Sequence, residues 1–462
     1  MTPRQWVQLI LIGLGASVVP LDTAVNIGFP EITHSFGLPI EAIQWVVICY
    51  VLTYASLLLA FGRIGDIFGH ARVFRTGLAW SVLAFSACAA APAYGWLLFC
   101  RFLQGIGAGL VISVAPALVT GQFPETRRSR AVAAFTTMFA LASAIGPLLG
   151  GALVNIWGWP AVFWFRAPIA LAALVFLTGL PRSAAPVQRE PLDFAGALLL
   201  ALTISTFLLL INQVPRLGRQ DWTAIPLFAL VAGAAAALVR RETRFPTPIV
   251  KPEFFRNLFF AAINLASVLV YLTSFAVLLF IPYYLVRVAG LALPWAGAVL
   301  AASFAGTIAA SPLAGRLIEP LGASRVALAG AMLGGAGLIA IGRCSTASPG
   351  AHLPVLAGLV AQGFGVGLFQ VAYMDFVLAT IPHGDRGVAG SLAMLTRTLG
   401  IVSGATLLSL VFHAFETSAL TGGQAPQAAF VIAFRSTLSA AGFVSILTGL
   451  AVFALAFRPR PR

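Results

Sequence analysis

The chain has 462 residues, of which 60% are hydrophobic and 9% are charged, and its 28 basic and 14 acidic residues give a formal net charge of +14. Apolar runs of about twenty residues recur along its length, which excludes a soluble globular domain and indicates a protein that crosses a membrane many times. The four cysteines lie in or beside these runs at spacings that fit neither a disulfide framework nor a metal site.

Breaks at proline, glycine and charged residues divide the apolar runs into about fourteen predicted membrane-spanning helices. Their approximate bounds are 6–27, 41–61, 76–92, 95–119, 131–155, 160–180, 194–214, 222–240, 258–286, 293–313, 325–342, 353–379, 387–412 and 436–457. We interpret the first run as a retained helix rather than a signal peptide, since no cleavage-type small-residue site with a polar segment follows it.

An acid in the first span and a base in the fourth are predicted to lie at the same depth. Asp22 and Arg101 are each about six residues from the outer end of their span, or about 9 Å below the membrane surface. Ionisable groups inside a membrane are costly and tend to face a partner or a water-filled cavity. A carboxylate whose cationic partner comes and goes can bind and release protons, so we predict proton coupling for Asp22 and Arg101. The alternative is that Asp22 caps a helix end or faces periplasmic water.

A polar hairpin after span 2, residues 62–73, returns after span 10 as residues 315–326. The residues of interest are Gly62, Arg63, Gly65, Asp66, Gly69 and Arg72 in the first copy and Gly315, Arg316, Glu319, Gly322 and Arg325 in the second. A second repeat, 104–110 and 362–368, recurs at nearly the same offset. Internal duplication in a protein with many spans indicates a transporter.

Asp66 is predicted at the cytoplasmic surface, facing the positive N-terminal end of another helix, most plausibly the start of span 13 near Arg386. Such a contact would hold the inside closed in one state and break in the other. The alternative is an aspartate that caps a turn in a solvated hairpin.

Small residues in spans 4 and 5 are predicted to pack helices rather than to bind ligands. They are Gly105, Gly107, Gly109, Gly146, Pro147, Gly150 and Gly151, and Pro147 can kink its helix. The glycine string in span 4 is not a nucleotide loop, because no strand precedes it.

The hairpins give the architecture, since each follows the second span of a six-span half and two spare spans remain between the halves. We expect an all-α integral membrane protein of six plus two plus six spans, with two pseudo-symmetric six-helix bundles. The expected domains are 1–180, 181–254 for the linker and inserted helical pair, and 255–462.

Two charged residues in the C-terminal spans and several aromatic residues are further candidates for functional sites. Arg397 lies about ten residues into span 13 and needs a partner or a cavity, whereas Asp375 lies toward the inner end of span 12, where solvent exposure is equally plausible. A pocket for a flat hydrophobic compound could be lined by Asn26, Tyr54, Tyr271, Phe369 and Tyr373. With 35 phenylalanines in the chain, packing or lipid contact is the alternative for such aromatics.

Basic residues set the orientation. With the N-terminus inside, twenty Lys and Arg residues fall in cytoplasmic segments and five in outer segments, so both termini are expected to be cytoplasmic. Because the positive charge is spread over these inner loops, we expect no nucleic-acid partner.

The motifs together resemble the major facilitator superfamily, and within it the fourteen-span drug:proton antiporters. The resemblance rests on the loop 62–72, on 101–109 in span 4, on the antiporter-type segment 146–151, on 21–30 at the end of span 1 and on 397–400. The chain departs from the family pattern in a shorter spacing from Asp22 to Asn26, which would turn the carboxylate by about 100° on an α-helix. Further departures are Ala142 in place of a glycine and Pro160 and Arg166 where the family often has Arg and Asn.

The resemblance implies a transporter that works by alternating access and exports hydrophobic or amphipathic drugs or metabolites in exchange for protons. The alternative is a proton-coupled symporter or importer of a small metabolite. An enzyme is not expected, because the five histidines are scattered near span ends, and nothing resembles a channel filter or a phosphate-binding loop for ATP. We expect no cofactor, and a proton as the coupling ion. The expected partners are a small-molecule substrate and the lipid bilayer. We expect a monomer in the bacterial inner membrane, with accessory export proteins as an alternative.

Overall fold

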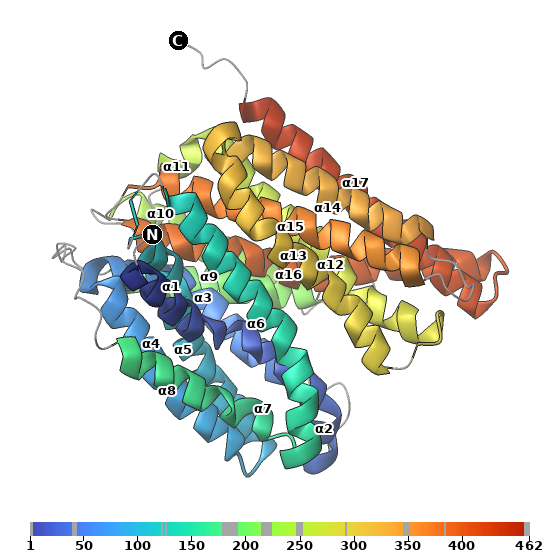
Figure 1. Cartoon of the computed structure of the whole chain (residues 1–462), viewed down its shortest axis with the longest axis horizontal. Coiled ribbons are helices and arrows are strands. Elements are labelled where there is room, and N and C mark those ends of the chain that lie inside the picture. Colours follow the sequence, from blue (N-terminus) through green and yellow to red (C-terminus); the bar gives the residue numbers. More distant parts are fainter. Residues whose placement is uncertain are drawn as a thin grey trace. The chain divides into compact units, whose positions relative to one another are not determined.

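Every regular element that the structure describes is helical (Figure 1). The structure is a computed structural model that describes residues 3–38, 44–121, 123–124, 127–177, 193–213, 224–245, 253–291, 293–344, 352–382 and 385–456. The helices of the N-terminal part are α1 (Pro3–Ser17), the 3₁₀ helix η1 (Pro20–Gly28), α2 (Phe29–Phe36), α3 (Gln44–Phe68), α4 (His70–Ala89), α5 (Tyr94–Thr120), α6 (Arg128–Trp157), α7 (Ala161–Trp164), α8 (Arg166–Leu177), α9 (Phe194–Gln213) and α10 (Ala224–Glu242). The others are α11 (Glu253–Arg256), α12 (Leu258–Arg287), α13 (Leu293–Leu321), α14 (Ala323–Cys344), α15 (His352–Thr380), α16 (Arg386–Thr421) and α17 (Pro426–Ala456).

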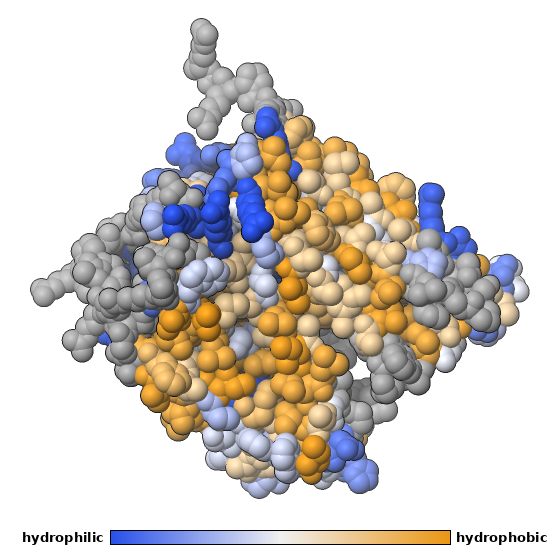
Figure 2. Space-filling view, viewed as in Figure 1, coloured by the Kyte–Doolittle hydropathy of each residue, from blue (hydrophilic) through white to orange (hydrophobic). Residues whose placement is uncertain are grey.

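Ten of the described helices are long and apolar enough to cross a membrane. Large apolar side chains cover much of the face seen in Figure 2. Several large apolar side chains of the protein are more than 60% exposed in the isolated chain, including Leu83, Leu198 and Leu447. Such a surface suits lipid rather than water, so the chain is a multi-pass membrane protein. The predicted number of fourteen spans stays a prediction, since α9 has only a short apolar stretch, Ala195–Phe207.

The chain divides into two compact units. The first comprises Met1–Phe207, Leu227–Pro252 and Val377–Leu395, and the second comprises Leu208–Pro226, Glu253–Phe376 and Thr396–Arg462. The end of α15 and the first ten residues of α16 therefore belong to the first unit, although the rest of both helices belongs to the second. The expected domain boundaries at 180 and 254 stay predictions.

In the first unit, α5 packs against both α3 and α4. A Cβ atom on Gly105 would lie 2.6 Å from the Cβ of Thr53 on α3, and one on Gly107 would lie 2.6 Å from the Oγ of Ser81 on α4. The glycines of α5 thus allow close helix contact, which is the packing role that their positions suggest.

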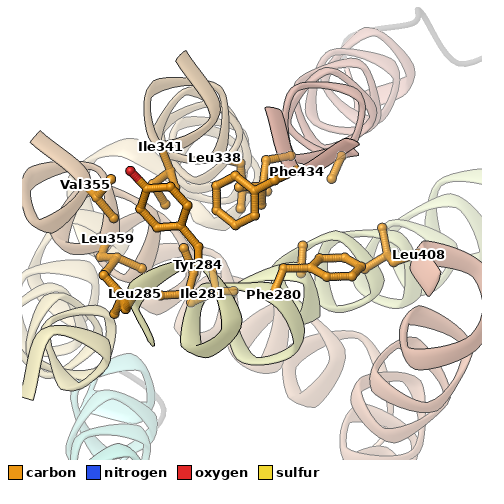
Figure 3. Close-up of a cluster of buried hydrophobic side chains, with 14 residues drawn as sticks. Phe280, Ile281, Tyr284, Leu285, Leu338, Ile341, Val355, Leu359, Leu408 and Phe434 are labelled. Carbon is orange, nitrogen blue, oxygen red and sulfur yellow. The ribbon is translucent and has the colours of Figure 1, made fainter. Parts of the chain in front are cut away.

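In the second unit, a buried apolar cluster joins α12, α14, α15, α16 and α17 (Figure 3). The rings of Tyr284 and Phe434 stack at its centre, with 4.8 Å between their centroids. Helices α14 and α17 also meet at Gly335 and Gly442, where a Cβ on either residue would lie 2.5 Å from the other's carbonyl oxygen. The unit is held by apolar burial and by backbone contact over glycine.

The two repeated polar hairpins are shorter turns than the sequence suggests. Helix α3 continues to Phe68 and α4 begins at His70, so Gly69 alone connects them, with φ of 94°. In the second copy Gly322 alone connects α13 and α14, with φ of 82°. Positive φ favours glycine, which explains why these two positions agree between the copies.

Candidate functional site

The segment that carries Asp22 is not an α-helix. Residues Trp6–Val25 form one apolar span, but α1 ends at Ser17 and a 3₁₀ helix, η1, begins at Pro20. Proline has no N–H to donate to a preceding turn, so a break at this point is expected. The predicted span is therefore present, whereas its expected continuity as one helix is wrong.

Asp22 lies in a dense ionic cluster of the first unit. Its Oδ1 and Oδ2 accept hydrogen bonds from Nη1 and Nη2 of Arg101 on α5, at 2.7 and 2.9 Å. Gln104, one turn further along α5, donates from Nε2 to Oδ1 at 3.0 Å. Arg166, the first residue of α8, donates from Nη1 to the same oxygen at 2.6 Å. The structure thus brings Asp22 and Arg101 together as their depths suggested, and it adds Arg166.

Aromatic rings and backbone carbonyls hold the two guanidinium groups. Nε of Arg101 donates to the carbonyl oxygen of Val46 at 2.7 Å, and its guanidinium lies 4.3 Å from the ring centre of Tyr50. The guanidinium of Arg166 lies 4.5 Å from the ring centre of Phe85. Stacking on an aromatic face suits the planar, weakly hydrated guanidinium and fixes its orientation.

The cluster has more positive than negative charge. Both arginines are fully buried, at 0% exposure, while the side chain of Asp22 is 14% exposed. Arginine stays protonated in proteins, so two guanidinium cations share one carboxylate. Within the part of the chain that the structure describes, Nη2 of Arg166 and the hydroxyl of Tyr50 have no hydrogen-bond partner.

Arg166 stands out in the sequence only as a departure from the family pattern, and its role stayed open there. The signal that singles out Arg101, a charged residue within an apolar run, applies equally to Arg166.

Glycines of α6 position the 3₁₀ segment. A Cβ on Gly150 would lie 2.8 Å from the carbonyl oxygen and 3.0 Å from the Cα of Ala24, and one on Gly146 would overlap the hydroxyl of Thr23. The antiporter-type motif of Gly146, Pro147, Gly150 and Gly151 thus lies on the helix that packs against η1. The close approach of α6 fixes the backbone two residues beyond Asp22.

Asp66, near the end of α3, contacts the first residues of α16, which is the helix start that the sequence predicted as its partner. Its Oδ1 accepts from the backbone N–H of Gly387 at 2.7 Å, and Oδ2 accepts from that of Val388 at 3.2 Å. His70, one turn along, contacts Oδ1 through Nε2 at 2.9 Å. A carboxylate on the free N–H groups of a helix start is stabilised by hydrogen bonds and by the helix dipole.

A second ion pair reinforces this contact. Nη1 of Arg63 donates to Oδ1 of Asp385 at 2.9 Å, and both side chains are less than 10% exposed. The backbones also approach closely, since a Cβ on Gly387 would overlap the carbonyl oxygen of Gly62. The first repeat copy, from Gly62 to Arg72, thereby joins the end of α3 to the beginning of α16.

The second repeat copy is placed differently. Arg316 and Glu319 are exposed in the last turns of α13, and Arg325 is exposed at the start of α14, whereas Gly315 is buried. The chemistry of the span 4 repeat also differs. Gln362 accepts from the hydroxyl of Ser303 at 2.7 Å, whereas its counterpart Gln104 contacts Arg101 and Asp22.

The other candidates lie mainly in the second unit. Arg397 lies 5.6 Å from the ring centre of Tyr271, and Asp375 is 4% exposed rather than solvated. Tyr373 stacks on Phe369 and donates its hydroxyl to Asn264 at 2.8 Å. Of the remaining pocket candidates, Tyr54 belongs to the first unit and packs on Tyr50, and the side chain of Asn26 lies outside the described residues. A pocket lined by these aromatics stays a prediction.

No group of three or more His, Cys, Asp or Glu residues in the described ranges could hold a metal ion. Among the described residues, ionisable groups converge around Asp22, around Asp66 and Arg63, and at Asp193. Their contacts are ion pairs and hydrogen bonds.

Comparison with known proteins extends over nearly the whole chain. A family model described as Major Facilitator Superfamily matches residues 9–241 and 263–462. The chain is 27% identical over 412 residues to the riboflavin transporter RibZ of Clostridioides difficile (strain 630), covering 88% of each protein. It is 28% identical over 428 residues to the multidrug resistance protein Stp of Mycobacterium tuberculosis (strain CDC 1551 / Oshkosh), covering 91% of this chain and 78% of that protein. Its fold resembles the crystal structure of the human organic anion transporter MFSD10 (TETRAN), with a TM-score of 0.68, 16% identity and coverage of 98% and 100%.

Proposed function

The chain belongs to the major facilitator superfamily, and from that premise we propose that it is a proton-coupled secondary transporter in which Asp22 is the proton-binding group. The family and the relatives make it a transporter and not an enzyme. The observation that carries the proposal is the placement of Asp22, a partly exposed acid inside the first span, between Arg101 and Arg166. Acids inside a membrane mark proton relays in many transporters, because burial there is otherwise costly.

We propose export of hydrophobic or amphipathic compounds as the direction of transport. Support comes from the multidrug resistance relative and from the antiporter-type motif on α6, whose glycines pack against the segment that carries Asp22. With this function go the finer assignments: a fourteen-span drug:proton antiporter of six plus two plus six spans, in the bacterial inner membrane, with both termini cytoplasmic.

A second candidate function is proton-coupled symport of a small metabolite. The surplus of positive charge around Asp22 favours it. A cation competes with a proton for one carboxylate, which produces exchange, whereas an anion attracted by two guanidinium groups binds more strongly once Asp22 is neutral, which produces co-transport. A relative named as a riboflavin transporter shows that similar chains also carry a metabolite.

The contacts of Asp66 and Arg63 would serve as the gate of the cycle. Asp66 binds the first turn of α16 and Arg63 binds Asp385 directly before it, through hydrogen bonds that a small displacement of that helix would break. A state in which they are broken would open the side on which they lie, in keeping with alternating access.

Everted membrane vesicles test the function. Respiration generates a proton gradient, a panel of cationic, neutral and anionic hydrophobic compounds is added, and gradient dissipation is recorded for wild type, Asp22→Glu and Asp22→Asn. We expect dissipation by a subset of compounds in wild type, reduced dissipation in Asp22→Glu, and none in Asp22→Asn. Asp193→Asn, which removes an acid outside the cluster, is the matched control and should behave as wild type. Equal dissipation in Asp22→Asn and wild type would remove Asp22 from the coupling path.

A further inference from the structure

We propose that the cargo of this carrier bears an anionic group, a carboxylate in the simplest case, and that Arg166 binds this group. The proposal rests on the proposed proton-coupled transport function, in its second form of co-transport, and names the class of its substrate. What carries it is the combination of two fully buried guanidinium groups, one shared carboxylate and one guanidinium nitrogen without an acceptor.

The charge count is the first step. Asp22 is the only carboxylate that forms an ion pair with Arg101 or Arg166 among the described residues. Neither arginine can lose its proton, so the cluster retains one uncompensated positive charge inside an apolar span. Buried charges in membranes are paired or face a pathway for ions and substrates. An anion is the partner that would balance this cluster.

The donors of the arginines are the second step. Arg101 uses all three of its nitrogens, on Val46, Asp22 and Gln104. Arg166 uses Nε and Nη1, and its Nη2 lacks an acceptor although the residue is 0% exposed. A buried N–H group without a partner is costly, and a charged one more so. Arg166 is therefore the residue with donors left for a ligand.

The hydroxyl of Tyr50 is a further buried polar group without a partner in the described chain. It lies on the same ring over which the Arg101 guanidinium stacks, so both unsatisfied groups belong to one cluster. A carboxylate has two oxygens with about four acceptor positions, enough to accept from a guanidinium nitrogen and a phenol together.

The aromatic residues around the cluster indicate the chemistry of the uncharged part of the ligand. Phe163 lies 5.8 Å from both guanidinium groups, and Phe85 and Tyr50 stack on one guanidinium each. Flat aromatic faces next to cations suit an amphipathic anion, whose charged end pairs with arginine while its apolar body contacts the rings. A cationic compound would meet the surplus positive charge and be repelled.

Binding to purified full-length protein in detergent is the first test. The probes are 1-naphthoate, 1-naphthamide and 1-naphthylmethylammonium, which share one ring system and differ in charge, with chloride as an inorganic anion, all at constant ionic strength with gluconate as the filler. The readout is the melting temperature of wild type, Arg166→Gln and Arg241→Gln. Arg241→Gln is the matched control, since Arg241 also pairs with a buried aspartate but lies outside the cluster.

We expect naphthoate to raise the melting temperature of wild type and Arg241→Gln, with an apparent affinity at least about tenfold weaker in Arg166→Gln, because a ligand that binds only the folded state stabilises it in proportion to its occupancy. The amide and the ammonium compound should have little effect. Equal responses of wild type and Arg166→Gln to naphthoate, or no response of either, would overturn the proposal. A chloride response that matches that of naphthoate and depends on Arg166 would assign an inorganic anion site and overturn the cargo claim.

Transport in proteoliposomes separates this inference from the function on which it rests. With an imposed pH gradient, we expect wild type to move naphthoate and Arg166→Gln to move it at least about tenfold more slowly. If naphthoate binds through Arg166 but no probe is moved, the transport function fails and the anion site stands. If the cationic or neutral probe is moved equally by both proteins and naphthoate is not, the anionic cargo is wrong and the transport function stands.

Discussion

Asp22 is a single carboxylate that compensates two buried cations, and this imbalance dominates the energetics of the site. Arg101 binds both of its oxygens, and Arg166 shares one of them. Removing one member of a buried ion pair is far more harmful than exchanging the whole pair for apolar residues, because the charge left behind has no partner.

The ratio of one carboxylate to two buried arginines predicts how variants of Asp22 and Arg166 change stability. Asp22→Asn leaves both guanidinium groups without a carboxylate, and we expect a loss of about 3–5 kcal/mol in the free energy of unfolding. Adding Arg166→Gln to Asp22→Asn removes one of these cations, so the double variant should melt at a higher temperature than Asp22→Asn alone. Melting of the purified proteins in detergent measures which variant is more stable. If the double variant loses as much stability as the two single variants together, the expectation is wrong.

The pair of Asp193, which is buried, and Arg241, whose side chain is 39% exposed, offers a pH test outside the apolar stretches of the chain. The carboxylate of Asp193 accepts from Arg241 at 2.9–3.2 Å and from the backbone N–H of Gly196 at 2.9 Å. Burial raises the pKa of Asp193, but these hydrogen bonds outweigh it and hold the pKa below the ordinary value of 3.8. A lowered pKa in the folded state means that the pair stabilises the fold above that pH, and that the stabilisation is lost as the pH falls through the lowered pKa.

We therefore expect Asp193→Asn to melt below wild type at pH 7 and the gap between the two proteins to close as the pH is lowered below 3.8. Melting curves at several pH values measure this gap. A gap that stays constant down to pH 3 would show that the pair acts through packing rather than through its charge.

Residue identity and depth were enough to pair Asp22 with Arg101, but not to find the third member of the cluster. The short spacing from Asp22 to Asn26 suggested that the carboxylate of Asp22 points away from the position usual in the family. That expectation held only for an α-helix, in which each residue turns about 100°. The segment is a 3₁₀ helix, in which each residue turns about 120°, so a position inferred from α-helical geometry does not hold for this segment. A break at Pro20 was the available signal in the sequence.

At the scale of elements, the contact between η1 and α6 controls where Asp22 points. Gly150 meets the backbone of Ala24, which a side-chain rotation cannot relieve. The motif on α6 thus acts on the charged cluster through packing.

Gly150→Ala should displace η1 and reduce both stability and transport. Inserting a methyl group into such a contact costs about 1–3 kcal/mol. Gly233→Ala on α10 is the matched control, because a Cβ there meets nothing within 4 Å, and the helix should gain about 0.5–1 kcal/mol. Thermal melting and gradient dissipation measure both effects. Equal stability of the two variants would argue against the packing role.

The junction of α3 with α16 can be tested by cross-linking. Asp66→Cys with Val388→Cys places two thiols where a carboxylate oxygen and a backbone nitrogen are 3.2 Å apart. We expect a short methanethiosulfonate linker to join them and to stop transport reversibly, because the helix start can then no longer leave α3. Reduction of the linker should restore transport. A linked protein that transports at the rate of the free one would show that this junction stays closed throughout the cycle.

The repeated hairpins illustrate what the sequence can show about elements. The pattern located both turns, and the agreement of Gly69 with Gly322 reflects a shared positive φ. It did not show that most of the polar residues lie inside helices, nor that Arg63 is buried while its counterpart Arg316 is exposed. That difference depends on which helix end each copy meets, and this is a property of distant segments.

At the scale of the whole molecule, the sequence repeats share glycines and the charges of the hairpins but not the ionic cluster. Position 359, which the repeat offset matches to Arg101, is a buried leucine. Of the two matched stretches on α5 and α15, only the first therefore carries a buried arginine at this position. The repeats were visible in the sequence mainly through glycines, because close helix packing constrains both copies in the same way.

The membrane topology gives a prediction at this scale. If α9 and α10 both cross the membrane, the segment 214–222 lies outside and both termini lie inside. We expect Arg219→Cys, in a protein without its native cysteines, to react with a membrane-impermeant maleimide in intact cells. A cysteine at Arg189 should react only after the membrane is opened. The reverse labelling pattern would exclude the arrangement of six plus two plus six spans.

Helix α16 is covalently continuous across the two compact units, and its length has a mechanical consequence. Its first ten residues are fastened to the first unit, whereas the 26 residues from Thr396 to Thr421 belong to the second. At 1.5 Å per residue that second part is about 39 Å long. A change of about 10° in the tilt of a helix of this length moves its far end by about 7 Å, so α16 cannot tilt away from Asp66 without a rearrangement of the helices that pack on it in the second unit.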